Sequence, residues 1–386
     1  MKPSLPIIIL FTALASQATA STTWYVNGMN GNDNNDCKSR QHACKTIGHA
    51  ISLASSGDSV RVAATTYKEN LTINFSLKIL GASATSTVLD GQGIGGNMVY
   101  IPNRAAHVTL SKLTIRNGGN VGGGGGIVNY ATLTVDDAII TGNRAEQGAG
   151  IENAGTITIN RSTVSKNSAD GGYDTYGGGI FNSSTARLMI NDSTLVGNVA
   201  HGEFVYGGAI YNEGGVLVIN NSTLTRNKAP GYGGAIVNDY QGTVTISNST
   251  ISENTASSGG GSAVAGFPMT FQNSIVADNH PGGNCSKAYR MISNGYNLSS
   301  DGTCHFHKTG DVNNTEPKLG MLGNHGGPTQ TIPEMLGSPT VDTGNPNGCT
   351  DGQGHLLKTD QRGYQRPGKY KSEKRCDMGA FERQSD

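Results

Sequence analysis

Two segments of the chain, together with one tyrosine that follows them, combine acidic side chains with aromatic rings. Aromatic residues make up only 6% of the sequence. The residues concerned are Asp170, Tyr173, Asp174, Tyr176, His201, Glu203, Phe204, Tyr206 and Tyr232. Aromatic rings pack against the apolar faces of sugars, while carboxylates accept hydrogen bonds from sugar hydroxyls. The combination predicts a binding site for a glycan or another macromolecule.

Two of these acids also suggest a catalytic pair. Glycosidases use two carboxyl groups separated by roughly 5–10 Å, one of which acts as the acid. Asp174 and Glu203 are the candidates for such a pair, and His201 could tune one of them. A third interpretation is structural: the two loops close over each other and bury their own tyrosine rings.

A repeated unit determines where these segments lie. Isoleucine, any residue and asparagine follow a glycine or alanine at intervals of 24 to 30 positions. The units are Ile127–Asn129, Ile151–Asn153, Ile180–Asn182, Ile210–Asn212 and Ile236–Asn238. Repeats of this length indicate stacked structural units.

Short runs with alternating apolar and polar residues separate the repeated units, as in Thr156–Asn160. No segment of helical length lies between them. The pattern predicts an all-β chain forming a single right-handed parallel β-helix, with each strand pairing with its equivalent in the next coil. We expect the Asn amides to hydrogen-bond from coil to coil and the glycines to occupy tight corners.

The loop lengths predict that the aromatic segments meet. The chain between a corner Asn and the next glycine run is long in two successive units, Ser168–Tyr176 and Val199–Tyr206, and shorter in Lys228–Tyr232. Because the coils stack in register, these insertions should emerge side by side on one edge of the solenoid.

Composition excludes several classes of partner. The chain has 386 residues with 28 basic and 28 acidic side chains. A nucleic-acid-binding protein would carry an excess of basic residues, so we expect no nucleic-acid partner. After the first residues no apolar run is long enough to span a membrane. We expect a monomer without membrane insertion and without a cofactor.

The chain divides into four parts. Residues 1–20 resemble a secretory signal peptide, with Lys2, the apolar stretch Ile7–Leu14 and a small-residue cleavage site at Ala18–Ala20. Residues 21–56 form an N-terminal cap in which Lys45–Leu53 has helical spacing. The β-helix coils occupy 57–280, and 281–386 hold the last coils and an irregular tail. We therefore expect a secreted, extracellular protein, with association to the cell surface or a periplasmic location as alternatives.

Six cysteines in an exported chain imply disulfides. They lie in pairs near the beginning, after the last repeat and in the tail. This placement predicts the bonds Cys37–Cys44, Cys285–Cys304 and Cys349–Cys376. We predict no metal site. The cysteines lack CxxC spacing, His305 and His307 lack a third ligand, and Asp33 with Asp36 are too few for calcium.

Several motifs resemble those of exported bacterial β-helix proteins of the choice-of-anchor Q domain type. They are Trp24–Asn27, Gly31–Asp33, Ala43–Ile47, Asn284–Cys285, Tyr296–Leu298, Ser300–Cys304, Gly326–Thr329, Gly337–Pro339, Asp360–Gly363, Arg366–Pro367 and Cys376–Glu382. The units Gly207–Ile210 and Gly233–Ile236 are similar to repeats of polymorphic outer-membrane proteins. The resemblance implies a pectin-lyase-like fold.

The broader fold resembles that of pectate lyases and polygalacturonases, but the polygalacturonase motifs Asn-Thr-Asp, Gly-His-Gly and Arg-Ile-Lys are missing. This absence favours an extracellular binding scaffold for glycans or other macromolecules. The alternative is a polysaccharide lyase or glycoside hydrolase that uses the aromatic and acidic loops. In the tail we expect a buried or half-buried ion-pair network among Asp360, Arg362, Arg366, Arg375, Asp377 and Glu382.

Overall fold

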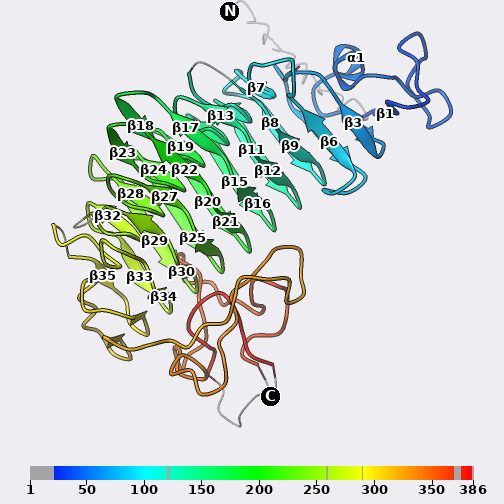
Figure 1. Cartoon of the computed structure of the whole chain (residues 1–386). Helices are drawn as coiled ribbons and strands as arrows, with labels where there is room; N and C mark the ends of the chain where they lie inside the picture. The colour runs from blue at the N-terminus through cyan, green and yellow to red at the C-terminus, as the bar shows by residue number, and fades with distance from the viewer. Residues whose placement is uncertain (1–20, 120–121, 258–259, 289, 369–374, 385–386) are drawn as a thin grey trace, which may run out of the picture.

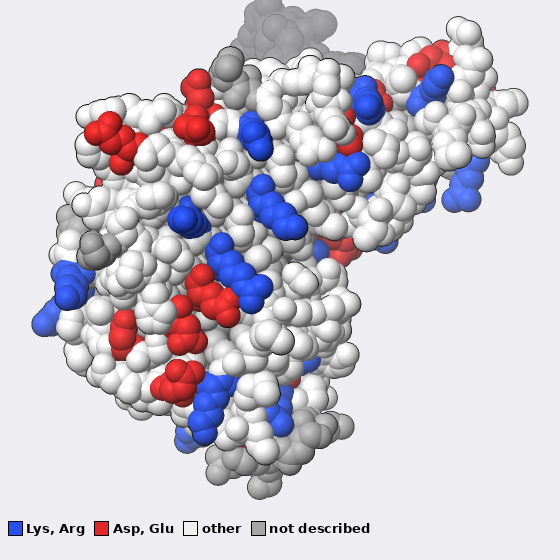
Figure 2. Space-filling view, viewed as in Figure 1, with Lys and Arg blue, Asp and Glu red and all other residues white. Residues whose placement is uncertain are grey.

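The computed structural model describes residues 21–119, 122–257, 260–288, 290–368 and 375–384, so the predicted signal peptide Met1–Ala20 lies outside the described residues. The chain winds into a stack of coils whose strands all run parallel to their neighbours (Figure 1). The fold is the all-β parallel β-helix that the repeat predicts. Basic and acidic side chains are scattered among uncharged ones on the face shown in Figure 2.

Three long sheets form the walls of the solenoid. Sheet A contains β1 (Thr23–Val26), β2 (Ser59–Val62), β5 (Leu77–Gly81), β8 (His107–Ser111), β11 (Thr132–Asp136), β15 (Thr156–Asn160), β20 (Arg187–Asn191), β25 (Val216–Asn220), β29 (Thr243–Ser247), β33 (Thr270–Gln272) and β35 (Ile292–Ser293). Sheet B contains β3 (Thr65–Tyr67), β6 (Thr87–Asp90), β9 (Thr114–Arg116), β12 (Ile139–Thr141), β16 (Thr163–Ser165), β21 (Thr194–Val196), β26 (Thr223–Thr225), β30 (Thr250–Ser252), β34 (Ile275–Ala277), β36 (Leu298–Ser299) and β37 (Val312–Asn313). Sheet C contains β4 (Leu71–Thr72), β7 (Val99–Ile101), β10 (Ile127–Asn129), β14 (Ile151–Asn153), β19 (Ile180–Asn182), β24 (Ile210–Asn212), β28 (Ile236–Asn238) and β32 (Val264–Gly266).

Two smaller sheets lie between sheets B and C in chain order. Sheet D contains β13 (Arg144–Ala145), β17 (Ser168–Asp170), β22 (Val199–His201), β27 (Lys228–Ala229) and β31 (Thr255–Ala256). The fifth sheet has two strands, β18 (Asp174–Tyr176) and β23 (Phe204–Tyr206).

The repeated unit builds sheet C. Its isoleucines Ile127, Ile151, Ile180, Ile210 and Ile236 are fully buried and pair with one another in register. Burying each of these side chains contributes about 1.5–3 kcal/mol relative to exposure. Because side chains alternate along a strand and the isoleucines point inward, the residue between Ile and Asn points out of the coil.

The expected asparagine ladders are present inside the solenoid. In sheet C the Nδ2 atom of each Asn donates to the Oδ1 atom of the next, from Asn129 to Asn238, at 2.7–2.9 Å. A second ladder runs from Asn143 through Asn167, Asn198, Asn227 and Asn254 to Asn279 at 2.9 Å. Both ladders are buried, and they hold successive coils in one register.

A short helix closes the N-terminal end of the stack, as expected. Helix α1 (Ile47–Leu53) begins two residues later than the helical spacing predicted, because the Thr46 side chain caps it and Asp33 accepts the Lys45 and Thr46 N–H groups. Glu69 accepts the N–H groups of Ile47 and Gly48 at its N-terminus. The helix buries Ile47, Ala50 and Ile51 against the first coil.

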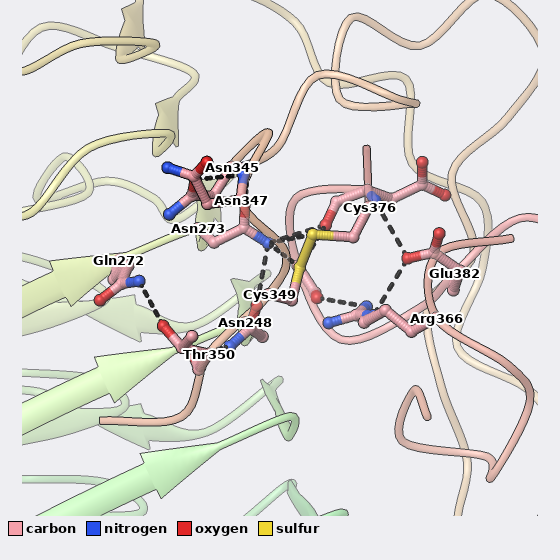
Figure 3. The surroundings of a disulfide bond; sticks show 12 residues. Asn248, Gln272, Asn273, Asn345, Asn347, Cys349, Thr350, Arg366, Cys376 and Glu382 are labelled. Carbon is pink, nitrogen blue, oxygen red and sulfur yellow. Dashed lines mark hydrogen bonds and ion pairs between the residues drawn. A yellow bond between two sulfur atoms is a disulfide. The ribbon is translucent and has the colours of Figure 1, made fainter. Parts of the chain in front are cut away.

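The three predicted disulfides are all present. The bond between Cys349 and Cys376 lies in the tail, next to a corner of the β-helix (Figure 3). There Asn273 donates through Nδ2 to the Asp377 carbonyl at 2.8 Å and to Asn248 Oδ1 at 2.9 Å. The disulfide thus ties two parts of the tail together where the tail contacts the solenoid.

The tail turns back along the outer side of sheet B (Figure 1). Gln361 joins the two parts: its Nε2 donates to Thr194 on β21 at 2.8 Å, and its Oε1 accepts from Thr223 on β26 at 2.6 Å. Thr250 on β30 accepts the Ala380 N–H. These outward threonines are buried because the tail covers them.

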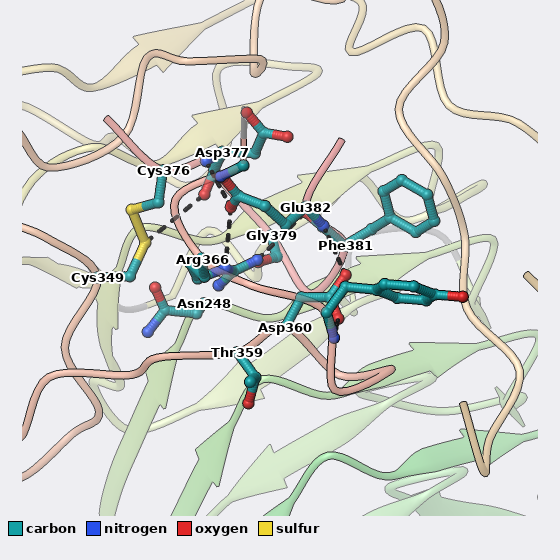
Figure 4. Close-up of polar contacts among 12 residues, drawn as sticks. Asn248, Cys349, Thr359, Asp360, Arg366, Cys376, Asp377, Gly379, Phe381 and Glu382 are labelled. Carbon is teal, nitrogen blue, oxygen red and sulfur yellow. Dashed lines mark hydrogen bonds and ion pairs between the residues drawn. A yellow bond between two sulfur atoms is a disulfide. The ribbon is translucent and has the colours of Figure 1, made fainter. Parts of the chain in front are cut away.

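The tail has a charged interior (Figure 4). Arg366 lies 3.0 Å from Glu382, with both side chains almost fully buried, and Arg362 lies 2.6 Å from Asp360. Asp377 accepts the backbone N–H groups of Asp342 and Arg383. Two ion pairs thus join four of the six residues of the predicted network, and the Asp377 N–H donates to Glu382 at 3.0 Å, whereas Arg375 forms no ion pair with a described residue.

Glu334 makes tail stability dependent on pH. It is 2% exposed, and among the described residues neither of its carboxylate oxygens has a hydrogen-bond partner. Burial raises the pKa of Glu334 well above its ordinary value, and the nearby Asp377 raises it further. The protonated form is the one that the fold accommodates. Protonated Glu334 contributes to the free energy of unfolding. This contribution is fully present below the ordinary glutamate pKa and is lost as pH rises through the higher pKa of Glu334 in the folded state.

We expect Glu334→Gln to be more stable than the parent protein at alkaline pH. The amide imitates the neutral acid and removes the cost of ionisation, a difference of at least about 1.4 kcal/mol for each unit of pKa shift. Thermal unfolding of both proteins between about pH 5 and about pH 9 measures this. Glu316→Gln, at an exposed site, is the control. Parallel pH curves for the parent and Glu334→Gln would show that Glu334 is ionised in the fold.

Candidate functional site: an aromatic strip beside carboxylates

The two long insertions lie side by side, as the loop lengths predicted. Strands β18 and β23 pair in parallel, with Asp174 opposite Phe204 and Tyr176 opposite Tyr206. Tyr206 forms a further bridge with Tyr232 of the next coil. Both insertions leave the solenoid after a corner Asn and return to it at a glycine, so stacking of the coils brings their equivalent positions together.

Buried residues hold the insertions in place. Thr175 is fully buried, and its hydroxyl donates to the His201 carbonyl at 2.5 Å and accepts the Gly171 N–H at 2.8 Å. Val205 packs in a small buried cluster with Ala200 and Ala229. Inward-pointing Thr175 and Val205 alternate with outward-pointing neighbours, which places the aromatic side chains on the outer surface.

Tyrosines of three successive coils stack in a row. The ring centroids of Tyr176 and Tyr206 are 5.6 Å apart with an interplanar angle of 13°, and those of Tyr206 and Tyr232 are 5.7 Å apart with an angle of 10°. Tyr173 and Phe204 form an edge-to-face pair at 4.9 Å. Such contacts add about 0.5–1.5 kcal/mol each to the burial of the rings.

Glycine corners bring this row over sheet C. Gly177 and Gly207 have φ values of 63° and 72°, and a Cβ at either would lie 2.2 Å from a backbone oxygen. The sharp turn brings the Tyr176 ring next to two outward rings of sheet C. Its ring centroid lies 4.7 Å from that of Tyr211 and 6.4 Å from that of Phe181. We call the combined surface the aromatic strip: Tyr173, Tyr176, Phe181, Phe204, Tyr206, Tyr211 and Tyr232.

Phe181, Tyr211 and Asp239 were not among the residues predicted from the sequence. Phe181 and Tyr211 occupy the middle position of the Ile-x-Asn unit, which points outward. Aromatic residues at this position of the repeat could therefore have been identified from the sequence. The Tyr211 hydroxyl donates to Asp239 Oδ2 at 2.9 Å. Asp239 directly follows the next unit, so its position depends on coil stacking.

The strip is partly covered by its own rings. Phe181 and Tyr211 are buried, and Tyr176 and Tyr206 are half-buried, as the structural interpretation expected for some of the rings. In contrast, Tyr173 is 63% exposed, Tyr232 50% and Phe204 41%. The strip therefore combines a rigid aromatic base with exposed rings at its rim, and the exposed rings are available to a ligand.

Carboxylates border the exposed rings. Asp170 pairs in register with His201, while Glu203 immediately precedes Phe204, the register partner of Asp174. The side chains of Asp170, Asp174, His201 and Glu203 are all exposed. Within the described residues, Asp170, Asp174 and Glu203 form no ion pair. Asp170 Oδ1 accepts the Gly172 N–H at 3.2 Å, and the exposed carboxylates of all three acids can accept further hydrogen bonds or attract a cation.

The described residues contain one group of three potential metal ligands within 4.8 Å of one another, Cys37, Cys44 and His49. Both cysteines are joined in a disulfide, so their sulfur atoms are not available as thiolates. Among the described residues, no helix has the length and apolar character needed to cross a membrane.

The fold of the chain has a counterpart among solved structures. Pectate lyase Pel9A aligns over 94% of this chain and 97% of its own, with a TM-score of 0.56 and 14% identity. The two proteins share the fold. A rhamnogalacturonan lyase aligns over 83% of this chain and 97% of its own, with a TM-score of 0.43 and 10% identity. A pectin methylesterase from Aspergillus niger covers 77% and 90%, with a TM-score of 0.39 and 16% identity. No family model and no curated protein match the sequence.

Proposed function

We propose that the chain is an extracellular glycan-binding scaffold and that the aromatic strip is its binding surface. The observation that carries the proposal is the row of rings held in register across three coils, with Tyr173, Phe204 and Tyr232 exposed at its rim. An extended polymer running along the stack would meet an equivalent ring at each coil. Because the coils fix the rings in advance, binding requires little ordering of the protein.

Further features support this proposal. Pel9A, a protein that shares the fold, is named as a lyase of pectate, a polysaccharide. Three disulfides and the signal-like segment Met1–Ala20 agree with export from the cytoplasm. The tail motifs that resemble choice-of-anchor Q domain proteins point in the same direction and suggest a role at the cell surface.

The alternative is a polysaccharide lyase or hydrolase in which Asp174 and Glu203 are the catalytic acids and His201 assists. Both carboxylates border the strip, as that mechanism requires. Catalysis also needs groups held in a fixed geometry. Asp174 and Glu203 are exposed, and no described residue holds their carboxylates by a hydrogen bond or ion pair. We therefore favour binding over catalysis.

We expect Tyr173→Ala and Phe204→Ala each to weaken glycan binding by about tenfold, because each removes an exposed aromatic anchor. Calorimetric titration of the purified protein with soluble oligosaccharides measures the affinity. Tyr100→Ala is a matched control: Tyr100 is also exposed on sheet C but belongs to β7, away from the strip. Equal losses in all three variants would contradict the assignment of the strip.

Activity assays separate the two functions. Incubation with the same glycans, followed by measurement of new reducing ends and of unsaturated products, tests for cleavage. We expect neither product from a binding scaffold. Turnover that disappears in Asp174→Asn or Glu203→Gln, with the fold intact, would establish the enzyme instead.

A further inference from the structure

The charge around the aromatic strip differs from that of the whole chain. The chain carries equal numbers of acidic and basic side chains, 28 of each. The strip, however, is bordered by Asp170, Asp174, Glu203 and Asp239, and within the described residues none of them is in an ion pair. Figure 2 shows acidic side chains over the corner of the stack where β18 and β23 lie. The strip is therefore locally negative on a neutral protein.

Nearby carboxylates contribute to raised pKa values of three tyrosines of the strip. Burial raises the pKa values of Tyr176 and Tyr206, and the carboxylates of Asp174 and Asp239 raise both further. Burial also raises the pKa of Tyr211, together with its hydrogen bond to Asp239. Two carboxylates from different coils thus act on the same group of rings, which places a shared negative potential along the strip.

We propose that the strip binds cationic glycans, that is, polymers of amino sugars with free ammonium groups, in preference to neutral glycans and polyuronates. This inference rests on the proposed function and adds the class of glycan. Ammonium groups form charge-assisted hydrogen bonds with the carboxylates and favourable contacts with the exposed faces of Tyr173 and Tyr232. The carboxylates of a polyuronate would meet carboxylates of the same sign, which disfavours binding.

Three oligosaccharides of equal length test the inference: oligomers of glucosamine, N-acetylglucosamine and galacturonic acid. They carry positive, neutral and negative charge at about pH 6, where Asp and Glu side chains on an exposed surface are ionised. We expect the glucosamine oligomer to bind at least about tenfold more tightly than its N-acetylated counterpart, and galacturonate to bind most weakly. Added salt should reduce the preference, because it screens exposed charges.

Variants connect the preference to the strip. We expect the ratio of the two amino-sugar affinities to approach one in the quadruple variant Asp170→Asn, Asp174→Asn, Glu203→Gln, Asp239→Asn. Asparagine at 239 retains an oxygen for the Tyr211 hydroxyl, so the rings keep their support. Glu316→Gln removes one exposed carboxylate from the tail and should leave the ratio unchanged. Thermal unfolding verifies that each variant is folded.

The outcomes separate the inference from the function on which it rests. If neutral or acidic oligomers bind as tightly as the glucosamine oligomer, and Tyr173→Ala still weakens their binding, the charge preference is wrong while glycan binding stands. If the preference persists in the quadruple variant, it arises elsewhere on the protein. If none of the three oligomers binds the folded protein, the proposed function fails and the inference fails with it.

Discussion

Replacing Arg366 with methionine should destabilise the tail by about 3–5 kcal/mol, because it leaves the buried carboxylate of Glu382 without its partner. Arg366 is fully buried, and its guanidinium also donates to the carbonyls of Gly379 and Phe381. Methionine fills part of the same space but satisfies none of these groups. Urea unfolding followed by intrinsic fluorescence, together with limited proteolysis of the tail, measures the effect.

An exposed ion pair provides the control for this prediction. Arg226 contacts Glu253 at 2.6 Å, with 49% and 39% of the two side chains exposed. Arg226→Met should therefore cost at most about 1 kcal/mol, because water replaces the lost contact. Adding Glu382→Leu to Arg366→Met should recover part of the stability by removing the unpaired charge. An equally small effect at both arginines would show that the tail interior is open to water.

The second large effect concerns the inner asparagine ladder. We expect Asn198→Ala to lower the free energy of unfolding by about 4 kcal/mol, at about 1 kcal/mol for each hydrogen bond lost. The Asn198 amide donates to Asn227 Oδ1 and to the Val164 carbonyl, and its Oδ1 accepts from the backbone and side chain of Asn167. All of these groups are shielded from water, so alanine leaves them without replacement partners.

An outer ladder gives a matched comparison. Asn160, Asn191 and Asn220 also hydrogen-bond from coil to coil, at 2.9 and 3.1 Å, but Asn191 is only half-buried. Asn191→Ala should therefore cost less than about 1 kcal/mol, since water can take its place. Chemical denaturation of both variants provides the comparison. If the two alanine variants were equally stable, the inner ladder would be a consequence of coil stacking and not a source of stability.

Much of the fold could be predicted because its determinants are local and repeated. The Ile-x-Asn unit specifies an inward apolar residue and a corner at the same place in each coil, so equivalent residues must stack. The placement of the cysteines in pairs predicted the three disulfides, helical spacing predicted the helix at the cap, and the loop lengths predicted the meeting of the insertions that carry Tyr176 and Tyr206. Sequence patterns could not identify Asp239, because its contact with Tyr211 joins two coils through side chains and not through the repeat.

The sequence by itself thus determined the solenoid, its register and the edge on which the aromatic residues gather, because a periodic pattern constrains every coil in the same way. Only the tertiary structure decided which rings cover each other and which stay exposed, since this depends on the sharp corners at Gly177 and Gly207. It also decided how the tail lies against sheet B. The tail has no period, and Gln361 meets Thr194 across 167 residues of sequence, a contact that no local pattern records.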